Sequence, residues 1–365
     1  MHRLVFLAVA AATPGVLAAQ SAGSAAVTTE ATVEPFDKAI ALEAVGVLAT
    51  KLEQNFVFPA VGKAYAAMLR ENLALGKYSE FADVQAFADA VTRDLQAVQK
   101  DGHLKVHIVP PEERLGPGNE NDAAASEPAG PPQSMNTISR SGWIADGVAY
   151  IRFESFFGTD ETMDALRAFI AEHRGARSLV IDIRTHRGGG LDEMDLLFPH
   201  LFSKTTGLLA MDTRASVIEN GGGLPPQETL RLVAAPEGIV RHEHVVTPAN
   251  DGAFQNTKVY VLTAKRTASA AEHLALALKR AGRATLIGET TRGAGNFGGM
   301  EPLDASFTYA AFIPFGRTFD PDTGQGWDGI GIEPNIAVPA DQALDEALRL
   351  AGVGLSGEAA LAAMK

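Results

Sequence analysis

The most constraining feature of this sequence is a strand–helix–strand unit in its second half. Residues 257–263 (TKVYVLT) and 283–289 (RATLIGE) are short apolar runs with the β-branched content of buried strands. Between them, SAAEHLALALKRAG at 269–282 has the composition of a helix. Two strands joined by a helical crossover lie parallel in one sheet, and such crossovers are right-handed. The unit therefore predicts an α/β domain.

Two upstream segments extend this domain. RSLVIDIR at 177–184 is apolar throughout, as expected of a central strand that is covered on both faces. GVAYIRFESF at 147–156 is a second strand, and TDETMDALRAFIAEH at 159–173 is a helix with Thr159 or Asp160 as its N-cap. The predicted boundaries are 141–345 for the α/β domain and 346–365 for a C-terminal helix or tail.

The N-terminal end has the layout of a secretory signal peptide. Residues 1–19 combine a short basic start, an apolar stretch and a run of small residues. Pro14 and Gly15 interrupt the stretch, which is too short to span a bilayer comfortably. We therefore expect an exported protein, periplasmic or secreted, with no stable membrane insertion. Residues 20–36, rich in Ala, Ser and Thr, are expected to be a disordered lead-in.

A helical region precedes the α/β domain. We predict an N-terminal helical domain at 37–108, because its apolar residues recur at helical spacing. The clearest stripe consists of Phe87, Val91, Leu95 and Val98. An alternating strand, residues 104–108, ends the domain. The following segment, 109–140, is predicted to be a Pro/Gly-rich loop, and it is too short and too polar to form a further folded domain.

The composition excludes several classes of function. The net charge is −13, which disfavours binding to a phosphate backbone, so no nucleic-acid partner is expected. The chain has no cysteine, which excludes disulfides, thiolate catalysis and Cys-ligated zinc. No cluster has the spacing of a metal site such as HExxH, and no metal or organic cofactor is predicted.

Ser269 follows a predicted strand and begins a predicted helix. Serine is a common N-cap, so a capping role is one interpretation. The other is a nucleophile, because free N–H groups and the positive end of the helix dipole stabilise a developing anion there. Ala268 and Ala270 leave space for a substrate to approach. The GxSxG pattern of α/β-hydrolases is absent, which indicates a different fold.

A glycine-rich turn follows the predicted central strand. Gly188, Gly189 and Gly190 allow backbone N–H groups to turn into a cleft. Gly188 or Gly189, together with the amide of Ala270, is a candidate pair of donors for an oxyanion hole. The alternative interpretation is a flexible turn without a catalytic role.

Several separated motifs resemble one protein family. TASAAEHLALALKRAGRATLIGETTRGAGN, VIDIRTHRGGG and FGRTFDPDTGQGWDGIGIEPN are similar to segments of the tail-specific, or C-terminal-processing, serine proteases of clan SK. LQAVQKDGHLKV resembles the branch of the interphotoreceptor retinoid-binding protein and the tricorn core. The resemblance covers about residues 37–345. It implies an α/β fold with a ClpP/crotonase-like core of β-β-α units and an N-terminal helical domain. It also implies a serine-type peptidase that hydrolyses peptide bonds in peptide or protein substrates.

The resemblance also implies a catalytic triad. Many members of the family use a lysine base in a GKG segment, but Ala294 stands at that position here, so a Ser–Lys dyad is not expected. The tricorn-like branch uses a histidine and an acidic residue. By position these are His103, in DGHLKV, and Asp328, in GWDGIGIEPN, where relatives often have glutamate. A neutral imidazole accepts the proton of Ser269, and a carboxylate fixes the imidazole tautomer.

Other residues compete for these roles. His186, in the glycine turn, is the alternative base, and His273 lies one helical turn after Ser269. Further candidates are His107 for the base and Asp101, Asp320 or Asp322 for the acid. A different function also stays open, because the retinoid-binding relative indicates that the scaffold can serve as a non-catalytic binding protein for apolar ligands. The sequence predicts no oligomeric state.

Overall fold

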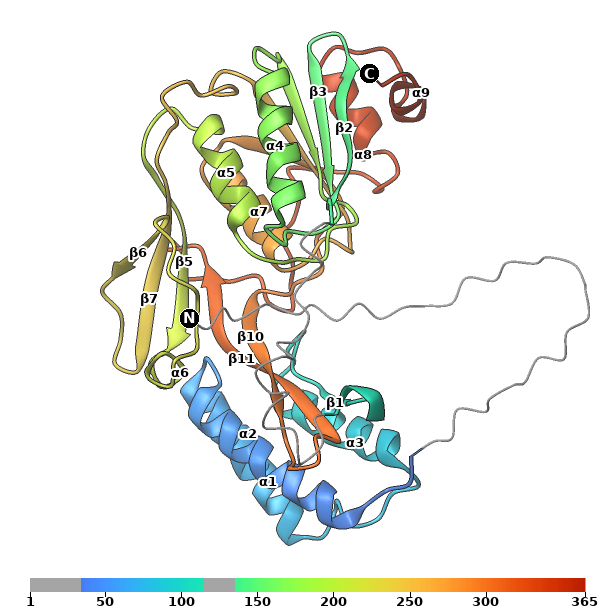
Figure 1. Ribbon diagram of the computed structural model, residues 1–365, viewed down its shortest axis with the longest axis vertical. Helices are drawn as coiled ribbons and strands as arrows, with labels where there is room; N and C mark the ends of the chain where they lie inside the picture. Colours follow the sequence, from blue (N-terminus) through green and yellow to red (C-terminus); the bar gives the residue numbers. More distant parts are fainter. Residues whose placement is uncertain (1–33, 115–134, 365) are drawn as a thin grey trace, which may run out of the picture.

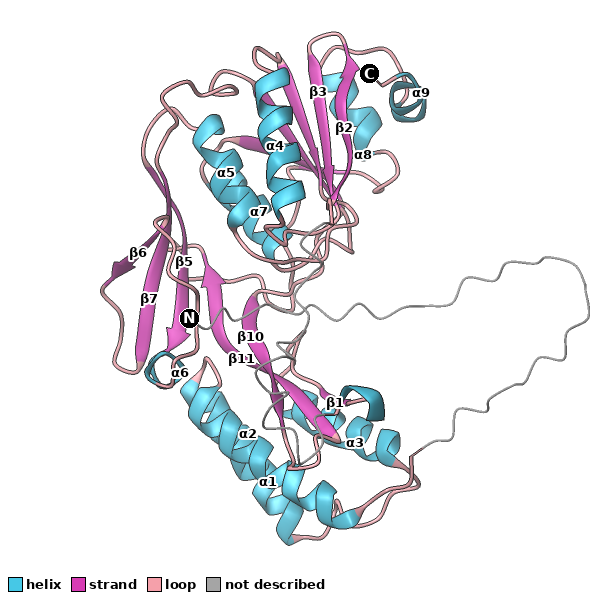
Figure 2. Cartoon of the chain, viewed as in Figure 1, coloured by secondary structure: helices cyan, strands magenta, loops and turns pink. Residues whose placement is uncertain are grey.

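The structure is a computed structural model that describes residues 34–114 and 135–364. The predicted signal peptide, residues 20–33 of the predicted lead-in and residues 115–134 of the predicted loop lie outside the described residues. The described chain forms two halves, each built around a sheet (Figure 1). One sheet is mostly parallel and the other is antiparallel, and Figure 2 shows them in the upper and lower halves of the molecule.

The parallel sheet has the strand order β12-β9-β8-β4-β3-β2 within the described residues. Its strands are β2 (Ile138–Ala145), β3 (Val148–Phe153), β4 (Ser178–Asp182), β8 (Lys258–Thr263), β9 (Ala284–Gly288) and β12 (Ile336–Ala337). Only β2 runs antiparallel to its neighbour. Every strand predicted for the α/β domain is present, and the predicted α/β fold class is confirmed. Strand β2 begins at Ile138, inside the segment predicted to be a loop.

Helices cover both faces of the parallel sheet (Figure 1). One face carries α4 (Asp160–Glu172), α5 (Asp192–Leu201) and α7 (Ala270–Arg280), and the other carries α8 (Ala343–Leu350) and α9 (Gly357–Ala363). Neighbouring strand residues point to opposite faces, as Tyr150 and Ile151 do. The predicted cap Thr159 accepts a hydrogen bond from the Thr162 N–H at 3.3 Å. Helix α8 crosses the predicted boundary at residue 345 and packs on the sheet, so it is part of the α/β domain.

The antiparallel sheet has the order β1-β11-β5-β7-β6, and β10 also pairs with β11. Its strands are β1 (Val106–Ile108), β5 (Thr206–Arg214), β6 (Leu230–Val233), β7 (Ile239–Val246), β10 (Asn296–Pro302) and β11 (Tyr309–Phe319), and α6 (Ala215–Glu219) follows β5. Only β1 was predicted from the sequence. The sheet continues below the carboxyl ends of the parallel strands, so segments from both sheets meet there (Figure 1).

The N-terminal helices pack on the antiparallel sheet. They are α1 (Lys38–Asn55), α2 (Pro59–Ala74) and α3 (Val84–Val98), and a short 3-10 helix, η1 (Pro111–Glu113), follows β1. The predicted stripe on α3 is buried except for Val98, and the ring of Phe87 lies 4.8 Å from the ring of Tyr309 on β11. The helices therefore share one core with β11, which fixes the segment after α3, including His103, against the rest of the protein.

Candidate active site

Ser269 occupies a strained turn between β8 and α7. Its φ is 57° and its ψ is −122°, a backbone conformation that costs energy for any residue except glycine and that clusters at functional sites. The Thr267 hydroxyl holds the turn, because it donates to the Ile183 carbonyl at 2.9 Å and accepts from the Ala264 N–H at 3.0 Å. A half-buried serine on a strained turn at a helix N-terminus is typical of a nucleophile.

Gly188 lies directly against Ser269. A Cβ added to Gly188 would lie 2.8 Å from the Cβ of Ser269 and 3.1 Å from its Oγ. The Gly188 N–H donates to Nδ1 of His186 at 3.0 Å, so this amide is already used. In the described part of the chain, the N–H groups of Gly189 and Ala270 donate to no acceptor. The turn therefore leaves two backbone donors free close to Ser269.

Glu272 connects Ser269 to the segment before β10. Its carboxylate is fully buried and accepts four hydrogen bonds. The donors are the N–H groups of Ser269 (2.9 Å), Gly293 (2.7 Å) and Ala294 (2.8 Å) and the hydroxyl of Thr291 (2.5 Å). Burial raises the pKa of Glu272, and the four donors oppose that shift. Sequence reasoning missed this residue, although Ser269 and Glu272 have the S-x-x-E spacing of a capping box.

His103 lies between α3 and β1, and its ring stacks on Phe312 of β11 with centroids 5.1 Å apart. Its backbone N–H donates to Oδ1 of Asp101 at 2.8 Å. Its Nδ1 is buried and has no hydrogen-bond partner within the described residues. Burial lowers the pKa of His103, the Asp101 charge opposes this, and the charges of Arg292 and Lys105 lower it further. The imidazole is therefore neutral, and able to accept a proton, near neutral pH.

Asn296 brings the carboxyl groups of Asp101 and Asp328 together. Its N–H donates to Oδ1 of Asp328 at 3.3 Å, and its side-chain amide donates to Oδ2 of Asp101 at 2.9 Å. Oδ1 of Asp328 also accepts from the Gly295 N–H at 3.0 Å. Burial and the charge of Asp101 raise the pKa of Asp328 to about 6. Both oxygens of Asp101 are occupied, since Oδ1 also accepts from the Leu104 N–H. Asp328 retains one oxygen without a hydrogen bond in the described chain.

The three predicted triad residues are linked only indirectly. Within residues 34–114 and 135–364, no hydrogen bond joins Ser269 to His103 or His103 to Asp328. The segment from Gly293 to Asn296 connects them, because it contacts Glu272 on one side and Asp328 on the other. A Cβ on Gly102 would lie 3.3 Å from the Gly293 carbonyl oxygen, so the His103 segment reaches the same place. Catalytic hydrogen bonds often tighten only when substrate binds.

The alternative candidates have other partners. His186 is fully buried, its Nδ1 accepts the Gly188 N–H, and burial lowers its pKa to about 3. Asp320 and Asp322 both bind Arg280, at 2.7 and 2.6 Å, at the far end of α7 from Ser269. His186 therefore supports the glycine turn, and the two aspartates hold the end of the helix.

His273 belongs to a chain of polar groups, buried at its two histidines, that sequence reasoning missed. Its Nε2 lies 2.8 Å from Nδ1 of His244 on β7, and Nε2 of His244 lies 3.0 Å from Oδ1 of Asp195 on α5. The Thr229 hydroxyl donates to the other oxygen of Asp195 at 2.9 Å. The chain joins the helix that follows Ser269 to the antiparallel sheet. No local pattern marks these residues, because they come from three separate elements.

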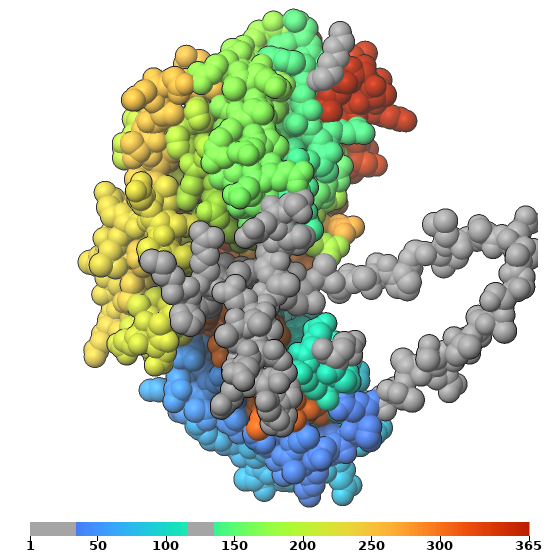
Figure 3. Space-filling view, viewed as in Figure 1, coloured from blue at the N-terminus to red at the C-terminus, as the bar shows by residue number. Residues whose placement is uncertain are grey.

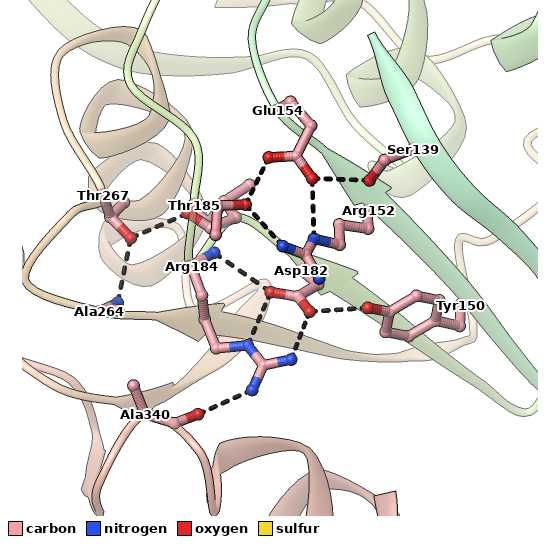
Figure 4. Close-up of polar contacts among 11 residues, drawn as sticks. Ser139, Tyr150, Arg152, Glu154, Asp182, Arg184, Thr185, Ala264, Thr267 and Ala340 are labelled. Atoms are coloured by element: carbon pink, nitrogen blue, oxygen red, sulfur yellow. Dashed lines mark hydrogen bonds and ion pairs between the residues drawn. The ribbon is translucent and has the colours of Figure 1, made fainter. Parts of the chain in front are cut away.

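A second buried network fixes the carboxyl end of the central strand (Figure 4). Nε and Nη2 of Arg184 donate to Asp182 at 2.9 and 2.6 Å, and the Tyr150 hydroxyl donates to the same carboxylate at 2.7 Å. Nη1 of Arg184 donates to the Ala340 carbonyl, just before α8, at 2.7 Å. The Asp-x-Arg motif is thus structural, because it ties the strand that precedes the glycine turn to the C-terminal helix.

The described residues lack two further features. None of their helices combines the length and the apolar composition of a membrane span. Nor do they contain a group of three or more histidine, aspartate or glutamate side chains that could hold a metal ion.

Comparison with known proteins places the chain in a family. Residues 147–338 match the model of peptidase family S41, and residues 37–141 match the N-terminal domain of this family in eukaryotic IRBP. Among solved structures, the chain is similar to the photosystem II D1 C-terminal processing protease, with 16% identity, a TM-score of 0.50 and coverage of 86% of this chain and 98% of that one. It is also similar to mature CPAF complexed with lactacystin, with 11% identity, a TM-score of 0.53 and coverage of 86% of this chain and 96% of that one. The similarity to the tricorn protease has 13% identity, a TM-score of 0.50 and coverage of 89% of this chain and 36% of that one.

The fold and the family match define a serine peptidase. The chain belongs to peptidase family S41, since the family model covers more than half of its 365 residues. The predicted family, fold class and enzyme class are therefore confirmed, and the substrates of such an enzyme are peptides or proteins.

Proposed function

We propose that this protein is an exported peptidase of proteins or short peptides that acts through Ser269, His103 and Asp328. The observation that carries the proposal is the strained turn of Ser269 against Gly188, beside the free N–H of Ala270. A capping serine does not require a left-handed backbone or an adjacent residue without a side chain. A nucleophile does need space above its hydroxyl and donors beside it.

In the proposed reaction, Oγ of Ser269 attacks the peptide carbonyl carbon while Nε2 of His103 accepts the hydroxyl proton. The free oxygen of Asp328 accepts the Nδ1–H of His103 and stabilises the imidazolium. This assignment gives a partner to an Nδ1 that is otherwise buried and unpaired. The imidazolium then protonates the leaving amine, and an acyl-enzyme remains. Water, deprotonated by His103, hydrolyses the acyl-enzyme and restores the serine.

The oxyanion of the tetrahedral intermediate accepts hydrogen bonds from the N–H groups of Ala270 and Gly189. Of the glycines in the turn, Gly189 is the better donor than Gly188, because the Gly188 N–H is held by His186. Gly188 instead provides the space beside Ser269. His186 is a positioning residue for this turn. It is a poor base, because its accepting nitrogen is occupied and its pKa is about 3.

The proposed export rests on residues 1–19, which have the layout of a cleaved signal peptide. A chain without cysteine is compatible with an oxidising and with a reducing compartment, so the cysteine content does not bear on this proposal. Expression with the native N-terminus tests it. We expect the protein outside the cytoplasm and a mature N-terminus close to residue 20 by mass spectrometry. An uncleaved chain that stays in the cytoplasm contradicts export.

Covalent labelling with a fluorophosphonate probe tests the catalytic assignment. We expect rapid labelling of the wild type, none in Ser269→Ala, and rates more than about 100-fold lower in His103→Asn and Asp328→Asn. Ser139→Ala and His107→Asn are matched controls outside the proposed site and should label at the wild-type rate. Labelling that persists in Ser269→Ala, or an unchanged rate in His103→Asn, overturns the triad. A folded wild type that does not label favours the apolar-ligand binding role.

A further inference from the structure

A small pocket lies beside the proposed base. It has a volume of about 270 Å³ and is lined by Gln96, Lys100, Asp101, Gly102, Arg292, Gly293 and Gly329. Lys100, Asp101 and Gly102 immediately precede His103, and Gly329 follows Asp328. Gly293 belongs to the segment that Glu272 holds next to Ser269. The volume is below the range of about 300–1,000 Å³ that encloses a whole small ligand, so the pocket fits one side chain or a chain end.

Two cationic side chains without a partner in the described chain line this pocket. Lys100 and Arg292 are exposed, and neither side chain makes a hydrogen bond or an ion pair with a residue of the described chain. The one carboxylate in the lining, Asp101, has both oxygens occupied by N–H donors. Gln96 is also committed, since its side chain binds the backbone of Asp101 and Leu104. The available hydrogen-bonding groups of the pocket are therefore cationic donors, in a chain whose net charge is −13.

The remaining wall is made of glycine. Gly102, Gly293 and Gly329 present no side chains, so a peptide can approach the backbone closely. At Gly293, φ is +84° and an added Cβ would lie 2.8 Å from the Gly331 backbone nitrogen, so a side chain at this position would collide with the neighbouring backbone.

We propose that this pocket binds a carboxylate of the substrate, on the leaving-group side of the cleaved bond, between Lys100 and Arg292. The side of the bond follows from the proposed function, on which this inference rests, because the base that protonates the leaving amine must lie next to it. An acidic side chain and a free C-terminal carboxylate both supply the required group, so the enzyme selects peptides with an acidic residue or a chain end just beyond the cleavage site.

Occupancy of the pocket also affects His103. Burial lowers the pKa of His103, Asp101 raises it, and Arg292 and Lys105 lower it. In the proposed triad, Asp328 is a further charged group beside His103, in addition to Asp101, Arg292 and Lys105. A carboxylate bound to Arg292 offsets the effect of that guanidinium and stabilises the imidazolium that forms during the reaction. An acidic substrate thereby gains in turnover as well as in binding.

Peptide binding to the full-length Ser269→Ala protein tests the pocket independently of catalysis. The probes are three fluorescein-labelled hexa-alanine peptides: a free acid, a C-terminal amide, and an amide with glutamate as the fifth residue. Fluorescence anisotropy should show tighter binding of the free acid, the glutamate peptide or both than of the neutral amide, by about three- to tenfold, as expected of two partly exposed ion pairs. Which of the two binds more tightly identifies the source of the carboxylate.

The preference should disappear in Lys100→Gln/Arg292→Gln on the Ser269→Ala background. Lys105→Gln is the matched control, because it removes a cation close to His103 that does not line the pocket, and it should retain the preference. Equal binding of all three peptides, or a preference that survives in the double variant, overturns the inference. Loss of fluorophosphonate labelling in His103→Asn is a separate result, so failure of the pocket and failure of the triad are distinguishable.

A pH profile provides a second readout. In the Ser269-containing enzyme, Arg292→Gln and Lys105→Gln should both move the acid limb of fluorophosphonate labelling to higher pH, because each removes a charge that lowers the pKa of His103. Only Arg292→Gln should also reduce the ratio of kcat/KM for acidic over neutral peptides. If the two variants reduce this ratio equally, the pocket does not select the carboxylate.

Discussion

Gly188 approaches Ser269 so closely that a methyl group at its Cα would lie 2.8 Å from the Cβ of the serine. Side chains essentially never make Cβ contacts this short, and both residues sit in tight turns that are fixed by hydrogen bonds. One turn follows β4 and the other follows β8, which are neighbours in the parallel sheet. The position of the proposed nucleophile therefore depends on the absence of a side chain in the adjacent turn.

Gly188→Ala should abolish fluorophosphonate labelling and lower the free energy of unfolding by about 1–3 kcal/mol. The new methyl group displaces Ser269, and alanine is strained at a φ of +127°. Gly175→Ala is the control, because φ is +79° there and nothing lies within 4 Å of the added Cβ. It should lose stability from strain alone and still label. Labelling of Gly188→Ala at the control's rate contradicts the predicted displacement.

Glu272→Gln should slow labelling and lower the free energy of unfolding by about 1–3 kcal/mol, the cost of an unsatisfied buried polar group. All four partners of this carboxylate are donors, so the amide nitrogen of glutamine necessarily faces at least one of them. Thermal unfolding and the labelling rate measure the two effects. Glu71→Gln, at an exposed position on α2, is the control. A variant with wild-type stability shows that the hydrogen bonds by which Glu272 joins Ser269 to Gly293 are dispensable.

The sequence predicted the part of the fold that local patterns specify. The strands around Ser269 are continuous apolar runs, and the helix after it has a clear start, so the turn that holds Ser269 was predictable. The antiparallel sheet was not. Strand β7 is half-buried along most of its length, and its burial alternates only over its last four residues. It forms a hairpin with β6, but its place in the sheet is set by its long-range pairing with β5.

The same limit applies to the candidate site. The family resemblance selected His103 and Asp328. No local pattern predicted Asn296, the first residue of β10, which binds both Asp328 and Asp101. Glu272 was accessible to sequence reasoning in part. Its spacing from Ser269 predicts the bond to the Ser269 N–H, but its bonds to Gly293 and Ala294 depend on tertiary packing.

Asp328 should make activity and stability depend on pH in opposite directions. Its pKa is raised from about 4 in an unfolded chain to about 6, so the fold favours the neutral acid. The stability contributed by this carboxyl is present below pH ~4 and is lost as the pH rises through about 6. Labelling should instead increase over this range, because only the carboxylate accepts the Nδ1–H of His103.

Asp328→Asn therefore should label slowly at every pH and be more stable than the wild type at pH 7.5, by at most about 3 kcal/mol. The advantage should vanish at pH 4, where the wild-type acid is neutral. Chemical denaturation at the two pH values measures it. A variant that is less stable than the wild type at pH 7.5 shows that the two N–H bonds to Oδ1 need the full carboxylate charge.

The chain from Asp195 through His244 to His273 should be required for stability and for the position of α7. When His244 donates from Nε2 to Asp195, its Nδ1 accepts from Nε2 of His273, so every facing nitrogen and oxygen is paired. His244→Leu leaves Nε2 of the buried His273 without a partner and removes one of the two hydrogen bonds to the partly exposed Asp195. It should lower the free energy of unfolding by about 1–3 kcal/mol. It should also slow labelling of Ser269, because His273 lies in the first turn of α7 and its backbone N–H donates to the Ser269 carbonyl.

His242→Ala is the matched control for His244→Leu. His242 lies two residues earlier on the same strand, is only half-buried, and makes no side-chain hydrogen bond within the described residues. The control should change thermal unfolding little.

Acid should also destabilise the wild type through His273. Burial, followed by the proximity of His244, lowers the pKa of His273 well below its usual value, so the folded state excludes a proton that the unfolded chain binds below pH ~6.5. The stability from this histidine is therefore present above that pH and falls as the pH decreases. If His273→Gln loses stability between pH 7.5 and 5 as steeply as the wild type, the buried pair is not a source of the acid sensitivity.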